Sequence, residues 1–148
     1  MEDKWDSMIQ TPERGVLHTH KAEFSPDGTQ IAVAYIDGII GLWSTYTGKL
    51  QMTLEYRKSR TDVSAGQYTN YDWEHFDIFT FSSTGKLATA GIDDPKETDS
   101  VSIVKIWDPR TGELLRQLKD VPGKISSVAI SPDCSQIALK SSKGAVGL

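Results

Sequence analysis

The chain has 148 residues, of which 38% are apolar and 24% are charged, as in ordinary globular proteins. The formal net charge is −4 with acids and bases interspersed, so no basic surface argues for nucleic acid or an anionic membrane as a partner. No apolar run approaches the roughly 18 residues of a spanning helix, no secretory leader opens the chain, and an unpaired Cys134 suits a cytoplasmic location.

Residues 1–17 are open to two interpretations. Trp5 and Asp6 could end the third strand of a preceding repeat, or the segment could be a frayed tail. His18 and His20 follow it one strand period apart, and such a pair could hold a metal ion. Because no third ligand is evident, we expect both histidines to be plain strand residues.

From residue 24 to residue 54 the chain carries strand and turn signals in a regular order. In residues 25–28 (SPDG), Pro fixes φ, Asp can bond its own backbone and Gly permits positive φ, which predicts a turn. Asp37-Gly38 and Thr47-Gly48 predict two further turns. The expected strands are one that ends at Phe24, then 31–35, 39–43 and 49–54. Four such strands form a meander that cannot bury both of its faces alone.

The same order of signals returns twice. The second copy has turns at 82–85 and 108–112, and strands that end at Phe81 or cover 87–91, 103–107 and 113–118. The third copy has strands over 125–130 and 137–140, and in the turn between them Cys134 takes the place of glycine. The corresponding residues Phe24, Phe81 and Ile130 are farther apart than the roughly 40–45 residues of a four-stranded propeller blade, so the excess must lie in loops.

FSPDG at 24–28 and IWD at 106–108, followed by Thr111-Gly112, are typical of WD40-repeat proteins, and the chain resembles that family over most of residues 18–148. The resemblance implies an all-β fold, a partial and open β-propeller of four-stranded antiparallel blades. An unrelated sandwich or barrel of short strands is the alternative. The expected parts are an uncertain segment or remnant of a preceding blade (1–17), a first blade (18–54), a long aromatic and charged loop (55–75), a second blade (76–118) with an insertion (92–102), and a truncated third blade (119–148).

The resemblance also implies a buried hydrogen-bonded tetrad in each blade. Its members in the family are a Trp on strand three, a Ser or Thr on strand two, a hairpin Asp, and the His of a Gly-His pair. The matching residues are Asp37 and Trp43 in the first blade, and Thr89, Asp93 (or Asp94) and Trp107 in the second. The first blade has Val33 at the Ser/Thr position, and the Gly-His pair is absent from both. We therefore expect partial networks that leave more of the stability to apolar packing.

Both insertions adjoin the second blade, and strand parity places them at one end of it, opposite the SPDG-type and Thr-Gly turns. In WD40 relatives this top face commonly receives peptides and partner proteins. An aromatic loop beside an acidic one could form an interaction hot spot with a polar rim, although independent loop expansion on a tolerant surface is an equal alternative. The acidic insertion lacks the Gly and the closing Glu of an EF-hand, so we expect a solvated loop and not a Ca²⁺ site. The candidate partner-binding residues are Arg57, Arg60, Tyr68, Tyr71, Trp73, Asp94 and Glu97.

Nothing in the sequence supports catalysis, because no Ser/His/Asp order, phosphate-cradling loop or paired carboxylates outside the loops is evident. The leading hypothesis is a non-catalytic protein–protein interaction scaffold without a cofactor. The alternative is a C-terminal sensor or regulatory propeller segment of a larger signalling NTPase whose catalytic domain is not in this chain. Aligning 145–148 with 39–42 leaves the third blade without its Trp and outer strand. We therefore expect the chain to need further blades from a longer chain or another subunit.

Overall fold

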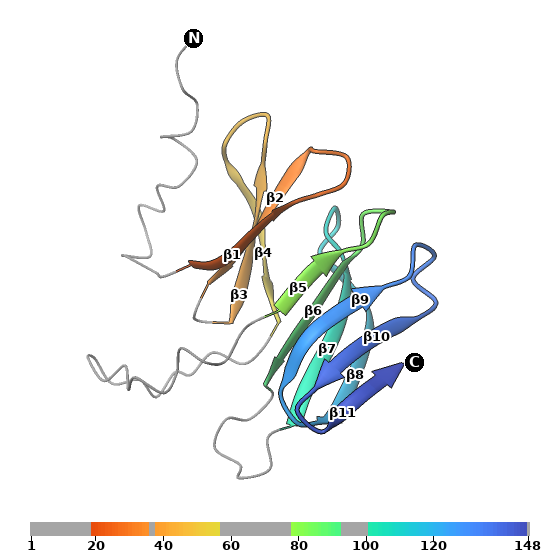
Figure 1. Ribbon diagram of the computed structural model, residues 1–148. Coiled ribbons are helices and arrows are strands. Elements are labelled where there is room, and N and C mark those ends of the chain that lie inside the picture. Colours follow the sequence, from red (N-terminus) through yellow and green to blue (C-terminus); the bar gives the residue numbers. More distant parts are fainter. Residues whose placement is uncertain (1–18, 36–37, 57–77, 93–100, 148) are drawn as a thin grey trace, which may run out of the picture.

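The computed structural model describes residues 19–35, 38–56, 78–92 and 101–147, and within these ranges the chain forms strands and turns but no helix (Figure 1). The predicted all-β class is confirmed. The strands are β1 (Thr19–Phe24), β2 (Gln30–Tyr35), β3 (Ile39–Ser44), β4 (Leu50–Glu55), β5 (Ile78–Phe81), β6 (Leu87–Ile92), β7 (Val101–Asp108), β8 (Glu113–Pro122), β9 (Ile125–Ile130), β10 (Ile137–Ser141) and β11 (Gly144–Gly147).

The strands form three open antiparallel sheets that follow one another along the chain. Sheet A has the order β1-β2-β3-β4, sheet B the order β5-β6-β7-β8, and sheet C the order β11-β10-β9. Every strand therefore pairs with its chain neighbour, as in a meander, and no sheet closes into a barrel. Figure 1 shows the three sheets side by side in chain order.

The β1–β2, β3–β4, β5–β6, β7–β8 and β9–β10 turns gather at one end of the sheets, which we call the turn end (Figure 1). Contacts between residues that are distant in sequence confirm this grouping. The Arg110 guanidinium of the β7–β8 turn lies 2.9 Å from the Asp27 carboxylate of the β1–β2 turn. The Thr84 hydroxyl of the β5–β6 turn donates to the carbonyl of Pro132 in the β9–β10 turn, at 2.7 Å. Each sheet thus presents its turns next to those of its neighbour.

Sheets A and B pack against each other through side chains that alternate along their strands. On β2, Ala32 and Ala34 are fully buried and leave room for larger side chains of the facing sheet, such as Phe79 and Leu87. Burial of this kind stabilises by roughly 25 cal/mol per Å² of apolar surface removed from water. The buried cluster comprises Ala32, Ala34, Ile40, Leu42, Leu54 and Tyr56 from sheet A and its continuation, and Phe79, Leu87 and Trp107 from sheet B.

The opposite face of sheet B packs against sheet C. Here Ala88 and Ala90 of β6 take the places that Ala32 and Ala34 have in sheet A. The cluster comprises Ala88, Ala90, Val104 and Val121 from sheet B, and Ile125, Val128 and Leu139 from sheet C. Sheet B is therefore covered on both faces, which its sequence requires because residues of either parity along β6 are apolar or small.

Strands β7 and β8 are longer than predicted. Val101 pairs with Pro122 and Ser102 with Val121, so the pairing extends beyond the expected strand limits at 103 and 118. Ser102 and Val121 are buried, and the Ser102 hydroxyl donates to the carbonyl of Gly123 at 2.8 Å. We predicted residues 101 and 102 as part of the acidic insertion. The sequence could not show otherwise, because a strand serine that bonds a backbone carbonyl is indistinguishable in sequence from a loop serine.

Strand β11 pairs one residue out of the predicted alignment. Gly147 pairs with Ala138, which corresponds to Ala32, and Ala32 pairs with Leu42. Gly147 therefore corresponds to Leu42, whereas the sequence alignment matched it to Gly41. The cause is the hairpin between β10 and β11, which is one residue shorter than the connection between β2 and β3. A shift of one residue exchanges the two faces of a strand, so the alignment of β11 side chains was wrong.

Candidate functional site

Most of the predicted site residues lie outside the described ranges. They are the two acidic members of the tetrad-like sets and the whole partner-binding set: Asp37, Asp93, Arg57, Arg60, Tyr68, Tyr71, Trp73, Asp94 and Glu97. His18, one of the two histidines weighed as metal ligands, also lies outside them. Within the described part of the chain, no group of three or more His, Cys, Asp or Glu side chains could hold a metal ion.

Trp107 and Thr89 are brought together in sheet B. The Trp107 indole Nε1 donates to the Thr89 hydroxyl at 3.1 Å, and both side chains are buried. Thr89 Oγ1 in turn lies 3.5 Å from the carbonyl oxygen of Lys105. The Lys105 ammonium lies 5.5 Å from the centroid of the Trp107 ring and donates to the backbone carbonyl of Glu55, in sheet A, at 3.2 Å. The buried indole is thus tied to its own sheet and, through Lys105, to the neighbouring one.

Trp43 has a different partner, which sequence reasoning missed. Its Nε1 donates to the hydroxyl of Tyr35 at 3.2 Å, because Val33 stands where sheet B has Thr89. Gly41 makes room for this arrangement. A Cβ at that position would lie 2.9 Å from the Tyr35 ring and 3.0 Å from Trp43 Nε1. The sequence did carry a signal for this contact. Tyr35 and Gly41 stand together in sheet A, where sheet B has Gly91 and Lys105 at the equivalent positions.

At the turn end, Asp27 organises the β1–β2 turn. Its carboxylate accepts hydrogen bonds from the Ser25 hydroxyl at 2.7 Å, the Thr29 hydroxyl at 2.8 Å and the Thr29 amide at 3.0 Å. These bonds, led by the Thr29 amide, hold the pKa of Asp27 well below its ordinary value. The same pattern recurs in the β9–β10 turn, where bonds from Ser131 and then Ser135 lower the pKa of Asp133 to about 2.

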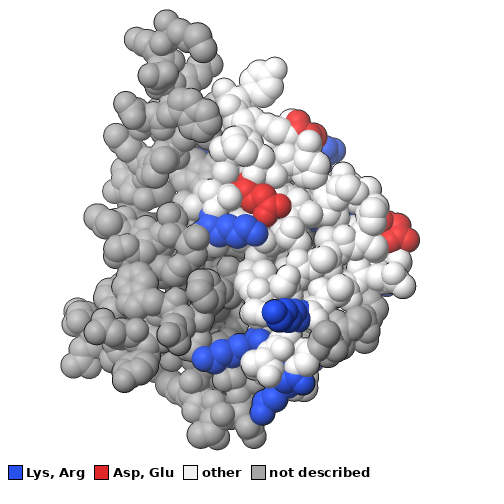
Figure 2. All heavy atoms as spheres, in the orientation of Figure 1, with Lys and Arg blue, Asp and Glu red and all other residues white. Residues whose placement is uncertain are grey.

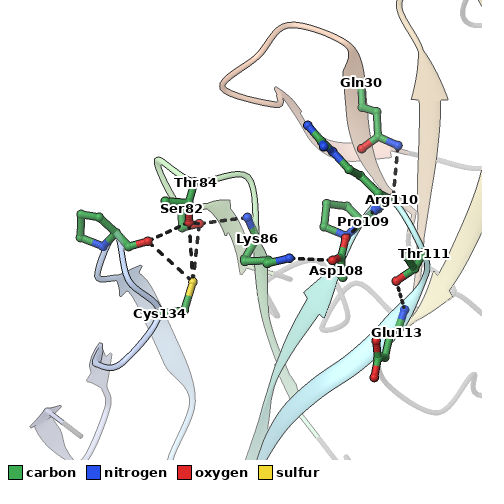
Figure 3. A network of polar contacts seen from close by, with 11 residues as sticks. Gln30, Ser82, Thr84, Lys86, Asp108, Pro109, Arg110, Thr111, Glu113 and Cys134 are labelled. Carbon is green, nitrogen blue, oxygen red and sulfur yellow. Dashed lines mark hydrogen bonds and ion pairs between the residues drawn. The ribbon is translucent and has the colours of Figure 1, made fainter.

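Polar contacts link sheets A and B at this end (Figure 3). The buried Gln30 amide donates from Nε2 to Gln51 Oε1 at 2.7 Å and to the carbonyl of Pro109 at 3.1 Å. The Pro109 contact crosses from sheet A to sheet B. The ion pair of Asp27 with Arg110 crosses beside it, but Arg110 is 77% exposed, so this pair contributes little to stability.

A second set of contacts continues through sheet B to sheet C (Figure 3). The Lys86 ammonium lies 2.6 Å from the Asp108 carboxylate, and this hydrogen bond is the main reason why the pKa of Asp108 is lowered. Ser82 and Thr84 lie 3.1 Å apart, and both contact Cys134 Sγ, at 3.8 and 3.9 Å. Cys134 adopts φ 59° in the position that the SPDG turn gives to glycine. Cys134 is therefore a turn residue of sheet C that takes part in the polar contact with sheet B.

Three of these turns enclose a shallow hollow of about 110 Å³. Its lining is mixed and comes from sheets A and B: Ser25, Pro26, Asp27, Gln30, Ser83, Thr84, Gly85, Pro109 and Arg110. The Ser25 hydroxyl donates to the Asp27 carboxylate, whose other hydrogen bonds hold the turn together, and the lining residues include no histidine. The volume is well below the roughly 300–1,000 Å³ of typical small-molecule sites. The hollow is best explained as a junction between turns.

Charge on the described surface is mixed. Figure 2 shows that white, uncharged residues cover most of the described face in this view, with single blue and red side chains among them. No helix of the described residues has the length and apolar character that a membrane crossing requires.

Comparison of this chain with protein-family models and with curated proteins gives no match.

Proposed function

We propose that this chain is a non-catalytic scaffold for protein–protein interaction, built as a segment of a WD40-type β-propeller and acting in the cytoplasm without a cofactor. The observation that carries the proposal is the regular succession of meander sheets. Sheet A covers one face of sheet B, and sheet C covers the other, in chain order. Propeller blades are four-stranded sheets repeated in this way around an axis.

The tryptophans of the third strands support the same interpretation. In the WD40 pattern this residue bonds a side chain of strand two, and here Trp107 bonds Thr89 while Trp43 bonds Tyr35. The two tryptophans have equivalent register, since Trp43 pairs with Ile31 and Trp107 with Leu87. The two tryptophans are therefore equivalent in strand pairing as well as in sequence.

The direction of the strands supports a binding face at the end opposite the turns. Strands β4 and β6 run away from the turn end, and β5 and β7 run toward it. The connections 57–77 and 93–100 therefore both leave and re-enter the sheets at that opposite end. We propose that aromatic and Arg side chains of the first connection anchor a protein or peptide partner, with acidic residues of the second at the rim. The proposed anchors are Arg57, Arg60, Tyr68, Tyr71 and Trp73, and the rim residues are Asp94 and Glu97.

Replacement of residues 57–73 by a short Gly/Ser linker tests this function. The tagged chain is used to capture partners in cells by proximity labelling, and a partner enriched by the parent chain should be lost with the linker variant. The matched control is Tyr46→Ala, in the 88% exposed Tyr46 of the β3–β4 turn at the opposite end, which should keep the partner. Thermal unfolding of all three proteins should coincide within a few degrees. Unchanged capture by a folded linker variant contradicts the proposal.

A further inference from the structure

One edge of sheet B is the outer side of β5, where no described strand pairs with it. The Ser82 amide donates to the carbonyl of Lys86 at 2.7 Å, so these two residues form a hydrogen-bonded pair at the end of the β5–β6 hairpin. Bonded and non-bonded pairs alternate along an antiparallel ladder, so the pairs that Phe79 and Phe81 make with β6 are non-bonded. The backbone N–H and C=O groups of Phe79 and Phe81 therefore point along the outer edge, away from β6.

Two charged side chains of β1, in sheet A, bond this edge. The Lys21 ammonium donates to the carbonyl oxygen of Phe79 at 2.6 Å, and the Phe81 amide donates to Glu23 Oε1 at 3.2 Å. Lys21 Nζ and Glu23 Oε2 lie 3.0 Å apart, and the ammonium also lies 4.7 Å from the centroid of the Phe79 ring. Lys21 and Glu23 are two residues apart on β1, so they lie on the same face of it. We call these two side chains the clasp.

The clasp makes the kind of bonds that a neighbouring strand would make. A strand offers N–H donors and C=O acceptors in alternation, and the clasp offers an ammonium to Phe79 and a carboxylate to Phe81. Charged side chains at an edge are one means by which proteins prevent strand pairing. The side chains of Lys21 and Glu23 are 42% and 30% exposed, so the bonds that they make are accessible from solvent.

The junction between sheets B and C lacks an equivalent of Lys21 among the described residues. Lys21 pairs with Ala34 and Ile78 pairs with the equivalent Ala90, so Ile78 takes the place of the lysine. Ile78 packs in the apolar cluster between sheets B and C, and β9 approaches β5 more closely than β1 does. The apolar cluster between sheets A and B contains neither clasp residue. The clasp can therefore release the β5 edge while this cluster keeps the two sheets together.

We propose that the outer edge of β5 is a strand-addition site for an extended peptide, and that the clasp keeps it closed until a peptide replaces both clasp bonds by backbone bonds. The occupant is an extended peptide because the groups along the edge are backbone N–H and C=O groups at the spacing of a strand. The site uses none of the residues 57–73 proposed above as partner anchors, so it adds a second interaction surface to the scaffold.

Amide hydrogen exchange measured by NMR tests whether the clasp protects the edge. The clasp-free variant combines Lys21→Met, which keeps an apolar stem over the Phe79 ring, with Glu23→Ala. The Phe81 amide should exchange at least about tenfold faster in this variant, because a hydrogen bond to a charged group contributes that much or more. The Thr80 amide faces β6 and should keep its rate.

Fluorescence anisotropy with a dye-labelled peptide tests strand addition. The peptide is acetyl-capped and has alternating Thr and Val residues between two lysines, which favours the extended conformation. The clasp-free variant should bind it at least about tenfold more tightly than the parent chain, since the parent chain must first break two bonds to charged groups. The same peptide with N-methyl groups on two consecutive central residues lacks a donor on each of its edges and should not bind.

Two control proteins isolate the clasp from other effects. Lys49→Met with Glu113→Ala makes the same changes of side chain at two exposed residues outside β1 and β5, and this variant should bind the peptide as weakly as the parent chain does. The chain with a Gly/Ser linker in place of residues 57–73 should also bind the peptide as the parent chain does. Loss of the cellular partner with unchanged peptide binding therefore separates the proposed anchors from the β5 edge.

Three results would overturn the proposal. Exchange of the Phe81 amide at the parent rate in the clasp-free variant would show that the clasp does not protect the edge. Equal affinity of the two proteins for the peptide, or no binding to either, excludes a strand-addition site closed by the clasp. Equal binding of the N-methylated peptide excludes an added strand. If the double variant does not fold, Lys21→Met and Glu23→Ala are tested singly, and each should give part of the increase.

Discussion

Single residues explain how each sheet is held together inside. The Trp107 indole is buried in the core between sheets A and B and bonded to Thr89, whereas Trp43 reaches the longer Tyr35 across Gly41. The resemblance implied Thr89 as a polar neighbour of Trp107, and the structure has a hydrogen bond between these two side chains. Tyr35 was not identified as the partner of Trp43, since this contact is possible only because residue 41 is a glycine.

Replacing Trp107 by Ala should lower the free energy of unfolding by about 3–5 kcal/mol, because it leaves a cavity in the core between two sheets. Thr89→Val should cost about 1–3 kcal/mol by leaving the indole N–H without its acceptor. Urea denaturation followed by circular dichroism measures both. Thr53→Val, at an exposed position of β4, is the control and should change stability by less than about 0.5 kcal/mol. Equal effects of Thr89→Val and Thr53→Val would show that the indole bond contributes nothing.

The carboxylates of the turns make stability depend on pH in a defined direction. The pKa of Asp108 is lowered from its ordinary value of 3.8, chiefly by the hydrogen bond from Lys86. A carboxyl group whose pKa is lowered in the folded state stabilises that state at pH values above its unfolded pKa. This stabilisation is lost as the pH falls through the folded pKa. Unfolding free energies measured by urea between about pH 5 and pH 2 should therefore decrease, and Asp108→Asn should make the decrease shallower. An unchanged slope in Asp108→Asn contradicts this assignment.

At the scale of strands, turn chemistry was the most reliable part of the sequence. The motif SPDG and the Thr-Gly pairs marked the turns correctly because Pro, Asp and Gly act through local geometry. Strand lengths were less predictable, since the extension of β7 and β8 depends on the buried Ser102 finding the Gly123 carbonyl. The predicted register of β11 was wrong for another reason, because the length of the hairpin sets which residues pair.

Gly41→Ala gives an element-scale test with a distinctive sign. In a strand, Gly→Ala ordinarily stabilises by roughly 0.5–1 kcal/mol, because glycine loses more conformational freedom on folding. Here the new Cβ would lie 2.9 Å from Tyr35 and 3.0 Å from the Trp43 indole nitrogen. We expect a destabilisation of about 1–3 kcal/mol, as overpacking costs. Thermal and urea unfolding measure it, and a stabilising Gly41→Ala would show that Tyr35 does not lie over residue 41.

At the scale of the whole molecule, the chain is a directional stack of sheets. Sheet B buries the small side chains of β6 against sheet C and larger side chains against sheet A, so its place between them follows from its sequence. The number of sheets and their chain order could be predicted because the turn signals repeat. The different burial of Phe24, which is 53% exposed, and of Phe81, which packs against the core between sheets A and B, could not be predicted, because the two residues look alike in sequence.

The most direct test of this account is a set of nuclear Overhauser contacts between methyl and aromatic protons of selectively labelled chain. The stack predicts contacts of the Ala32 and Ala34 methyls with the Phe79 ring, and of the Ala88 and Ala90 methyls with Val128 and Leu139. Absence of either set, or contacts of Ala32 with Val128 in their place, would contradict the stacking of sheets A, B and C in chain order.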